Sequence, residues 1–365
     1  MYKAYKMRMF PTDEQKILIQ KTFGCCRWYW NQALHDNIEC YKENGKGKIN
    51  TPATYKQEYT WLKEVDSMAL CNVQMDLQSA FSKFFSQKEV GYPKYKSKKN
   101  PKNRYTTTVT KGFDVSEDYI KLPKLSKVKI VNHRHKVGIA KSCTISMDSC
   151  GRYFVSCLFE EEITPLPQID KELGVDLSLK DFAICSDGTK FPVLQSLRNN
   201  LPKLKKEQRK LSKMERGSKN YERQKIKVAE LHSHIANARK DYLHKISYKL
   251  INENQVICLE DLNVKGLLKN HHLALSISDV GWSEFVSMLQ YKAGWYGRTI
   301  QKIDRFFPSS QICSCCGFSS GKKPLYIREW TCPNCGVTHD RDINASINIL
   351  SEGKKIIAAS TCRDR

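Results

Sequence analysis

The sequence predicts an α/β and β chain whose two main parts differ in fold class. Apolar residues recur at helical spacing up to about residue 87, and strand-like patterns follow across 119–160. After an expected linker at 165–170, short buried-type strands alternate with long helices, which is typical of an α/β domain. At roughly 100–200 residues per domain, the 365 residues allow two or three domains.

The composition indicates the class of partner. Lys and Arg number 61 against 38 Asp and Glu, which gives a formal net charge of +23. Such a charge repels itself unless a polyanion neutralises it, so nucleic acid is the first partner that we expect. An anionic membrane surface is a weaker candidate, because the basic residues spread over the whole chain.

The hydrophobic content and the cysteines predict a soluble, cytoplasmic protein. A hydrophobic fraction of 40% argues against global disorder, and no apolar run approaches the roughly 18 residues of a membrane span. No apolar stretch after Met1 could serve as a secretory signal. We therefore expect the 15 cysteines to be mostly reduced thiols or metal ligands.

The N-terminal part should begin with a strand and continue as a helical region. Residues Lys3–Phe10 alternate, and a capping-box pattern at Thr12 and Gln15 predicts the start of a helix. A basic loop at 91–99 ends the helical region, and the strands of 119–160 predict a small antiparallel barrel or sheet.

The C-terminal part should contain two long basic helices between buried-type strands. Strands are expected over 173–185, 255–260 and 299–304, and helices over 201–216, 220–253 and 282–296. Between residues 203 and 249, 15 basic residues outnumber 5 acidic ones. A single run of this kind is more often a solvated helix face, but in so basic a chain it favours phosphate contact.

The strongest local motif is a pair of Cys-x2-Cys knuckles. Cys313 and Cys316 form the first knuckle, and Cys332 and Cys335 form the second after 15 intervening residues. This is the spacing of a four-thiolate zinc site. Cys315 is an alternative partner for Cys313, although the symmetry of the knuckles favours Cys316. Because four cysteine ligands close the coordination sphere, we expect a structural Zn²⁺.

Three carboxylates stand where a two-metal phosphodiesterase needs them. Asp176 lies in the middle of an apolar strand, Glu260 ends a second buried-type strand, and Asp342 opens an apolar helix. Two divalent ions roughly 3.5–4 Å apart need several hard oxygen ligands, which three acidic groups can supply. One such residue alone is more often an N-cap or a surface ion pair, but the three together favour metal binding.

Two further patterns are weaker. His133 and His135 form a His-x-His pair of the kind that tyrosine transposases use, but their Lys-rich surroundings favour a phosphate or surface role. The aromatic residues Trp28, Tyr29 and Trp30 could stack on bases. Because consecutive residues of a helix span most of a turn, at least one of them should belong to the core.

Long motifs in the second half of the chain resemble those of one family. They cover Gly174–Lys180, Leu259–Asn263, Asp304–Gly317 and Cys332–Ala345. In this order they resemble the TnpB family, which comprises transposon-encoded, RNA-guided nucleases related to the ancestors of type V CRISPR effectors. The resemblance extends from Tyr5 to about Ile349, nearly the whole chain.

The resemblance implies a domain order. A RuvC-like, ribonuclease-H-type nuclease domain is interrupted by a zinc ribbon and preceded by a β-barrel wedge domain with an inserted helical recognition lobe. The implied boundaries are 1–10 and 116–168 for the wedge barrel, 11–115 for the recognition lobe, 169–311 and 338–352 for the nuclease domain, 312–337 for the zinc ribbon and 353–365 for a C-terminal tail.

The resemblance also implies an activity. A guide RNA from the transposon end would direct Mg²⁺-dependent cleavage of complementary double-stranded DNA beside a short adjacent motif. Asp176, Glu260 and Asp342 would be the catalytic ligands of two Mg²⁺ ions. Asp340 competes for the third place, but the family pattern Asp-x-Asn-Ala favours Asp342. We expect a monomer in a prokaryotic cytoplasm, associated with the nucleoid.

Nucleic-acid contacts are expected on both parts of the chain. Phosphate contacts should come from residues 94–136 and from the helices of 203–249. The individual residues that we expect to contact nucleic acid are Lys94, Lys96 and Lys98, together with Arg27 on the first predicted helix.

Two positions depart from the family pattern. Many relatives carry a Gln-Gln pair where this chain has Cys71 and Asn72, on the helix that faces the adjacent motif. We expect Asn72 to read base edges there, which leaves the motif's sequence open. Gly294 stands where many relatives carry Glu, a change for which the sequence offers no physical reason.

Three hypotheses about function follow. The first is an RNA-guided DNA endonuclease. The second is a guide-directed DNA-binding repressor or a CRISPR-guided effector of the same ancestry, and loss of an acidic ligand would favour the repressor. The third is a transposase that acts directly on DNA. The weak His-x-His pattern of His133 and His135 is the only sequence feature that supports it. Because all three acidic ligands are present, the sequence favours the first.

Overall fold

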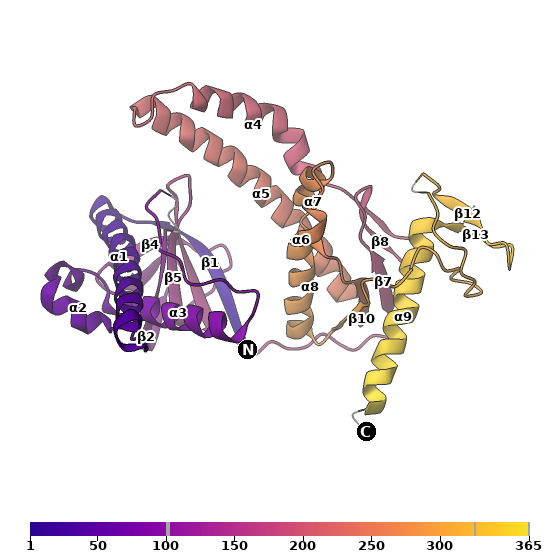
Figure 1. The fold of residues 1–365 in the computed structure, drawn as a ribbon, viewed down its shortest axis with the longest axis horizontal. Helices are drawn as coiled ribbons and strands as arrows, with labels where there is room; N and C mark the ends of the chain where they lie inside the picture. Colours follow the sequence, from indigo (N-terminus) through magenta and orange to yellow (C-terminus); the bar gives the residue numbers. More distant parts are fainter. Residues whose placement is uncertain (100–102, 325, 364–365) are drawn as a thin grey trace. The chain divides into compact units, whose positions relative to one another are not determined.

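The computed structural model describes residues 1–99, 103–324 and 326–363 (Figure 1). The chain divides into two compact units, residues 1–162 and 163–365. Neither helix nor strand occurs in the described stretch 161–171, which contains the predicted linker at 165–170. Within the described ranges, no helix is long and apolar enough to cross a bilayer.

Antiparallel strands of the first unit close into a barrel in the order β1-β4-β3-β2-β5-β6. Their bounds are β1 Tyr2–Phe10, β2 Arg104–Val115, β3 Tyr119–Leu122, β4 Ser126–Val131, β5 Gly138–Met147 and β6 Tyr153–Glu160. Burial alternates along β6, as expected for a strand with one face in the core. The predicted strand at the N-terminus and the predicted barrel are both confirmed.

Helices are inserted between β1 and β2. They are α1 Asp13–Asn44, α2 Pro52–Glu58, the 3-10 helix η1 Thr60–Lys63 and α3 Ser67–Ser86. The predicted capping box starts α1: Gln15 N donates to Thr12 Oγ1 at 3.3 Å, and Thr12 N donates to Gln15 Oε1 at 3.0 Å.

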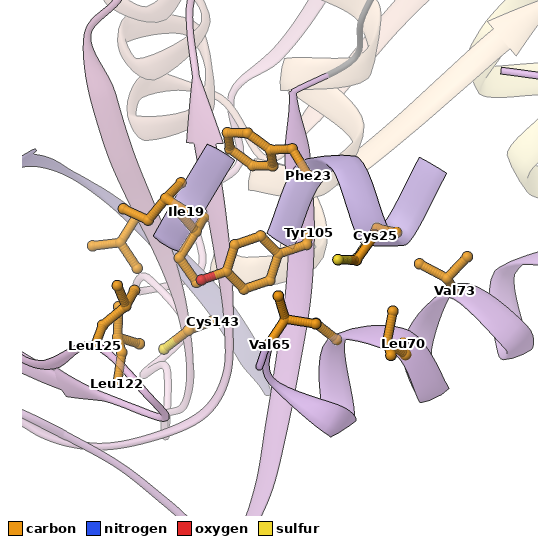
Figure 2. Close-up of a cluster of buried hydrophobic side chains, with 14 of the residues drawn as sticks. Ile19, Phe23, Cys25, Val65, Leu70, Val73, Tyr105, Leu122, Leu125 and Cys143 are labelled. Carbon is orange, nitrogen blue, oxygen red and sulfur yellow. The ribbon is translucent and has the colours of Figure 1, made fainter. Parts of the chain in front are cut away.

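The inserted helices and the barrel share one hydrophobic core. Figure 2 shows Ile19 and Phe23 of α1 and Leu70 of α3 gathered with Tyr105 of β2, and all four are buried. The predicted extent of the helical lobe, to residue 115, is wrong, because residues 104–115 form β2 in the barrel. Its run of Thr and Val favours a strand, and it pairs with β5.

The second unit is built on a mixed sheet in the order β11-β10-β7-β8-β9. The strands are β7 Glu172–Asp176, β8 Asp181–Cys185, β9 Lys190–Pro192, β10 Val256–Glu260 and β11 Thr299–Ile303. β10 is parallel to both β7 and β11, whereas β8 is antiparallel to β7 and β9. The α/β class predicted for this part is confirmed.

Helices cover both faces of this sheet. The helices of this unit are α4 Ser196–Ser212, α5 Lys219–Glu253, α6 Val264–Leu267, α7 Ala274–Val280, α8 Trp282–Tyr296 and α9 Arg341–Arg363, and of these α5 and α8 cover one face of the sheet while α9 covers the other. Val175 of β7 and Leu259 of β10 are buried in a cluster with α5 and α8, whereas Cys258 of β10 clusters with Ile349 of α9. Because side chains alternate along a strand, the even-numbered residues of β7 and β10 belong to the face that α9 covers.

Gly174 allows α9 to approach β7 closely. A Cβ atom at this position would lie 2.0 Å from the backbone oxygen of Ser346 in α9. A Cβ atom at Gly353 would lie 2.3 Å from Cys258 Sγ of β10. The described residues of the predicted C-terminal tail, 353–365, continue α9 as far as Arg363, and Gly353 and Ile356 at its start pack against the sheet.

A helical hairpin and a small cysteine module complete the second unit. In Figure 1, α4 lies against the first half of α5 and away from the sheet, with a core of Leu204, Val228 and Ile235. Both helices were predicted, although α4 begins at Ser196. The cysteine module lies between β11 and α9 and contains the antiparallel strands β12 Glu329–Thr331 and β13 Thr338–Asp340, so its pairing continues past the predicted boundary at residue 337.

Candidate metal centres and nucleic-acid contacts

The cysteines of the two knuckles come together in space. The Sγ atoms of Cys313, Cys316, Cys332 and Cys335 all lie within 4.8 Å of one another. Cys313 Sγ is 3.7 Å from Cys335 Sγ, and Cys316 Sγ is 3.7 Å from Cys332 Sγ. Cys315 is exposed and lies outside the group. Four thiolates so arranged could hold a metal ion such as zinc.

The two knuckles have the same backbone geometry. Gly317 N donates to Cys313 O, and Gly336 N donates to Cys332 O, both at 2.9 Å. Both glycines have positive φ, 75° at Gly317 and 71° at Gly336. Glycine adopts this left-handed conformation without strain, which explains why a glycine follows each cysteine pair.

Neighbouring polar groups act on the thiols. Asn334 Nδ2 lies 3.5 Å from Cys316 Sγ, and its hydrogen bond is the main cause that lowers the pKa of Cys316 to about 6. His339 Nε2 lies 3.1 Å from Cys313 Sγ, and its ring packs against Trp330 with centroids 5.0 Å apart. Sequence reasoning missed His339, whose place shortly after Cys335 was the available signal.

The sheet register brings Asp176 and Glu260 to the same edge. β7 and β10 are parallel neighbours in which Val175 pairs with Leu259, and the two acidic residues directly follow that pair. Both belong to the face covered by α9. Asp176 is the last residue of β7 and not in its middle as predicted, because the chain then turns towards β8.

The first turn of α9 contributes Asp342, while Asp340 caps the helix. Asp340 Oδ1 accepts from Asp342 N at 2.9 Å and from Ile343 N at 3.0 Å, and its Oδ2 accepts from Lys190 Nζ at 2.6 Å. Burial opposes the ionised form, but these bonds prevail and lower the pKa of Asp340. Asp342 instead pairs with Arg328, whose Nη1 lies 3.1 Å from its Oδ2. Both oxygens of Asp340 are thus engaged, and both oxygens of Asp342 accept from Arg328 Nη1, at 3.3 Å and 3.1 Å.

Burial disfavours the ionised forms of two of the three carboxylates. Burial, with the charges of Glu260 and Asp342, raises the pKa of Asp176 to about 8. Burial also raises the pKa of Glu260. Among the described residues, the four cysteines are the one group identified as able to hold a metal ion, and the three carboxylates are not identified as a second.

Ser309 is a second residue that sequence reasoning missed. It is buried, and its Oγ donates to Glu260 Oε1 at 2.6 Å. Ser309 lies within the motif Asp304–Gly317, but its neighbours in the sequence do not indicate its contact, and only the folded chain brings it to Glu260. A hollow of about 180 Å³ is lined by Glu260, Trp282 and Lys302 among others.

The basic loop of the first unit is held against α1. Asn31 Nδ2 donates to Lys96 O at 3.0 Å, and Lys96 N donates to Asn31 Oδ1 at 2.7 Å. Trp30 Nε1 donates to Lys94 O at 3.0 Å, and Lys96 Nζ lies 3.6 Å from the centre of the Trp30 ring. Lys98 is exposed further along the same loop. The structure therefore fixes two of the predicted lysines beside α1.

Asn72 packs towards the barrel. Its Nδ2 donates to Met68 O at 2.8 Å and lies 3.4 Å from Thr108 Oγ1 of β2. Arg27, the other predicted contact on a helix, is half-buried on α1. Both side chains are thus partly accessible.

The remaining sequence patterns have structural explanations. Tyr29 is fully buried and Trp30 nearly so, which confirms that part of the aromatic run is core. Trp28 packs against other aromatic rings of the first unit. His133 and His135 are exposed, and neither belongs to a candidate metal group within the described residues.

Family models match three stretches of the chain. One described as "Probable transposase" covers residues 155–271, one described as "Cas12f1-like, TNB domain" covers 282–349, and one described as "Helix-turn-helix domain" covers 1–46. In this structure the last stretch consists mainly of β1 and the long helix α1.

Two relatives align with nearly the whole chain. A protein of Streptomyces pristinaespiralis is 39% identical over 99% of this chain and 91% of its own length. InsQ of Escherichia coli K12 is 32% identical over 97% of this chain and 93% of its own. Both carry the name "Putative RNA-guided DNA endonuclease".

The solved structure of Cas12f1 in a complex with sgRNA and target DNA has a similar fold. Its TM-score is 0.61 at 12% identity, covering 96% of this chain and 98% of that one. The chain therefore belongs to the class of proteins with a Cas12f1-like fold. Within that class, the chain belongs to the TnpB family, as the full-length relatives and the transposase model show.

Proposed function

We propose that this protein is an RNA-guided DNA endonuclease. It binds a guide RNA derived from a transposon end and cleaves complementary double-stranded DNA beside a short adjacent motif. The two relatives that align over nearly the whole chain are named for this activity. The observation that carries the proposal is the parallel register that sets Asp176 beside Glu260, on the sheet face covered by the helix of Asp342.

The second unit supports a RuvC-like nuclease domain interrupted by the cysteine module. Its acidic residues come from the ends of two neighbouring strands and from the first turn of the helix packed on them. The cysteine module lies between β11 and α9 in the sequence. It therefore interrupts the chain of this domain, whereas Asp176, Glu260 and Asp342 remain on the sheet and on the helix that covers it.

The donor set fits Mg²⁺. Asp176, Glu260 and Asp342 offer only hard oxygen ligands, and bound cations would relieve the repulsion that helps to raise the pKa of Asp176. Two Mg²⁺ ions held by these residues would supply an activated water and stabilise the departing oxygen in an in-line displacement. The chain itself orients the ligands: Asp340 fixes the first turn of α9.

The cysteine group fits a structural Zn²⁺ ion. Four thiolates leave no open coordination position, and a bound zinc ion would favour the deprotonated form of each cysteine. We infer that this ion folds residues 312–337.

One experiment tests the proposed function. The protein is purified with co-expressed RNA, that RNA is sequenced, and a DNA library with randomised flanks beside the matched target is offered to the complex. We expect Mg²⁺-dependent cuts with 5′-phosphate and 3′-hydroxyl ends, beside one enriched motif, and no cuts in EDTA. Equal cutting of DNA that lacks the guide match would refute guide-directed cleavage.

The same assay separates the alternatives. Binding of the matched DNA without cleavage in Mg²⁺ or Mn²⁺ would indicate a guide-directed repressor. A co-purified guide that matches a CRISPR array would instead indicate a CRISPR-guided effector. The presence of all three acidic residues on one sheet edge and its covering helix favours the nuclease.

We also propose where nucleic acid is bound. The helices α4 and α5, the loop containing Lys94, Lys96 and Lys98, and Arg27 of α1 contact phosphates. If so, affinity for the guide RNA should fall by roughly 10³-fold or more between 50 and 200 mM salt. A flat salt response would assign the charge another role.

Asn72 is proposed to read one position of the adjacent motif. A base contact from Asn is worth about 1–3 kcal/mol of discrimination. Asn72→Ala should therefore relax the motif at one position in the library assay and leave RNA binding intact. Asn72 Nδ2 also donates to Thr108 Oγ1, so the substitution could change stability. The melting temperature of the variant is therefore measured as the control.

A further inference from the structure

The segment from Ser309 to Ser314 joins the two candidate metal centres. At its start, Ser309 Oγ donates to Glu260 Oε1 at 2.6 Å. Near its end, Cys313 contributes its Sγ to the four-cysteine group. The segment therefore touches both a carboxylate of the proposed active site and a ligand of the proposed zinc ion.

Two buried asparagines of α9 clamp this segment. Asn348 Nδ2 lies 2.8 Å from Ser309 O and 2.7 Å from Ile312 O. Asn344 Nδ2 donates to Ile312 O at 2.7 Å, and Asn344 Oδ1 accepts from Ser314 N at 2.8 Å. Asn344 is 1% exposed and Asn348 is 6% exposed. Because buried amides are costly without partners, these bonds hold the segment in place.

The clamp lies on the helix that also carries Asp342. Asn344 and Asn348 are four residues apart, so they share one face of α9, and Asp342 lies in the first turn of the same helix. The position of the segment is thus tied to α9 through the asparagines and to β10 through Ser309 and Glu260.

We propose that Ser309 is a positioning residue for Glu260, and that the asparagine clamp couples the cysteine module to the carboxylate site. The proposal rests on the proposed role of Glu260 as a metal ligand. The hydroxyl of Ser309 engages Oε1, and within the described part of the chain Oε2 has no hydrogen-bond donor, which leaves it for a cation. Hydrogen bonds of this kind orient ligating carboxylates, and their loss typically costs about 10–100-fold in metal affinity or activity.

Ser309→Ala isolates the hydroxyl. It keeps the backbone oxygen of Ser309, so both bonds from Asn348 stay in place. Ser309→Thr keeps the hydroxyl and should restore the wild-type behaviour. Ser310→Ala is the matched control, because Ser310 is the next residue and makes no bond to Glu260 in the described part of the chain.

The first test uses the full-length protein with its co-purified RNA. Two quantities are measured: the Mg²⁺ concentration that gives half-maximal cleavage, and Mn²⁺ binding from the spectroscopic signal of free Mn²⁺. Ser309→Ala should raise the Mg²⁺ midpoint about 10-fold or more and weaken, by a similar factor, the Mn²⁺ sites that are lost in Glu260→Ala. Its zinc content and melting temperature should match the wild type.

The outcomes distinguish this inference from the proposed function. If Glu260→Ala cleaves like the wild type, the proposed metal site is wrong. If Glu260→Ala is inactive but Ser309→Ala keeps the wild-type Mg²⁺ midpoint and Mn²⁺ affinity, only the positioning role is refuted. The same holds if Ser310→Ala shifts both quantities as much as Ser309→Ala does.

A second pair of variants tests the clamp. Asn348→Ala removes the bonds to Ser309 O and Ile312 O, and should raise the Mg²⁺ midpoint at least as much as Ser309→Ala. Asn344→Ala leaves the Ser309 bond intact and should give a smaller shift. If both variants melt like the wild type and keep its Mg²⁺ midpoint, the coupling is refuted. If Asn348→Ala does not fold, Asn344→Ala decides alone by the same criterion.

Discussion

The four-cysteine group and the three carboxylates are assembled in opposite ways. The cysteines belong to one short module, and their Sγ atoms already lie within 4.8 Å of one another. The carboxylates come from β7, β10 and α9, three elements that lie far apart in the sequence. Burial and their mutual repulsion raise the pKa of Asp176 to about 8.

This difference predicts what the loss of one metal ligand should do at each site. A site built from one short segment depends on the metal that folds it, so losing a ligand should unfold the module. A site built by sheet register and helix packing depends on the fold around it, so losing a ligand should remove activity and leave the fold intact. The predictions below test this contrast.

The largest expected effect concerns the two acidic residues at the start of α9. Asp342→Ala should slow cleavage by on the order of 10³-fold, because it removes a proposed metal ligand. Asp340→Ala removes the N-cap of α9, which costs about 1 kcal/mol of stability, and should slow cleavage less. Single-turnover cleavage by the two RNA-bound variants gives the comparison. If Asp340→Ala is the slower enzyme, Asp340 is the third ligand.

The next effect should be local unfolding of the cysteine module. Cys332→Ser should reduce the zinc content from about one ion per chain towards none, because it removes one of four thiolates. Hydrogen exchange should then rise within residues 312–337, and target-DNA binding should weaken. Cys315→Ser is the control, since Cys315 is exposed and outside the group. A zinc-free protein that still cuts DNA would contradict a structural role for the metal.

A smaller effect is expected where α9 packs on the sheet. Gly174→Ala should destabilise the second unit by about 1–3 kcal/mol, because the new Cβ would overlap the backbone oxygen of Ser346. Gly294→Ala is the contrasting variant: Gly294 is exposed in α8 with open space around its Cβ position, so alanine should stabilise by about 0.5–1 kcal/mol. Thermal melting should show opposite signs. A lower melting temperature for Gly294→Ala would show that glycine is needed there for another reason.

Local patterns predicted local structure well. The capping box of Thr12 and Gln15, the alternation of the barrel strands and the cysteine knuckles each depend on residues close in sequence, and each is found in the structure. The knuckles could also be resolved against Cys315, because their symmetry reflects identical backbone hydrogen bonds.

Long-range contacts could not be predicted in the same way. The strand β2 was assigned to the helical lobe, because its partner β5 lies far along the chain and only pairing places it in the barrel. Ser309 contacts Glu260 only in the folded chain, where the segment before the first cysteine knuckle lies against β10. The spacing of residues in the sequence therefore does not predict this contact. Asp176 was placed within its strand, since an apolar run does not show where a strand ends.

The most direct test of the account separates cutting from binding in one variant. Asp176→Ala and wild-type protein, each with the same guide RNA, are compared for cleavage and for binding of matched DNA in Mg²⁺. Asp187→Ala is the control, because Asp187 pairs with Lys171 beside the opposite end of β7. We expect Asp176→Ala to lose cleavage, because the activation free energy of the cleavage step rises by several kcal/mol. The variant should bind RNA and DNA like the wild type. Cleavage that persists, or binding that is lost with it, would show that Asp176 is not a metal ligand.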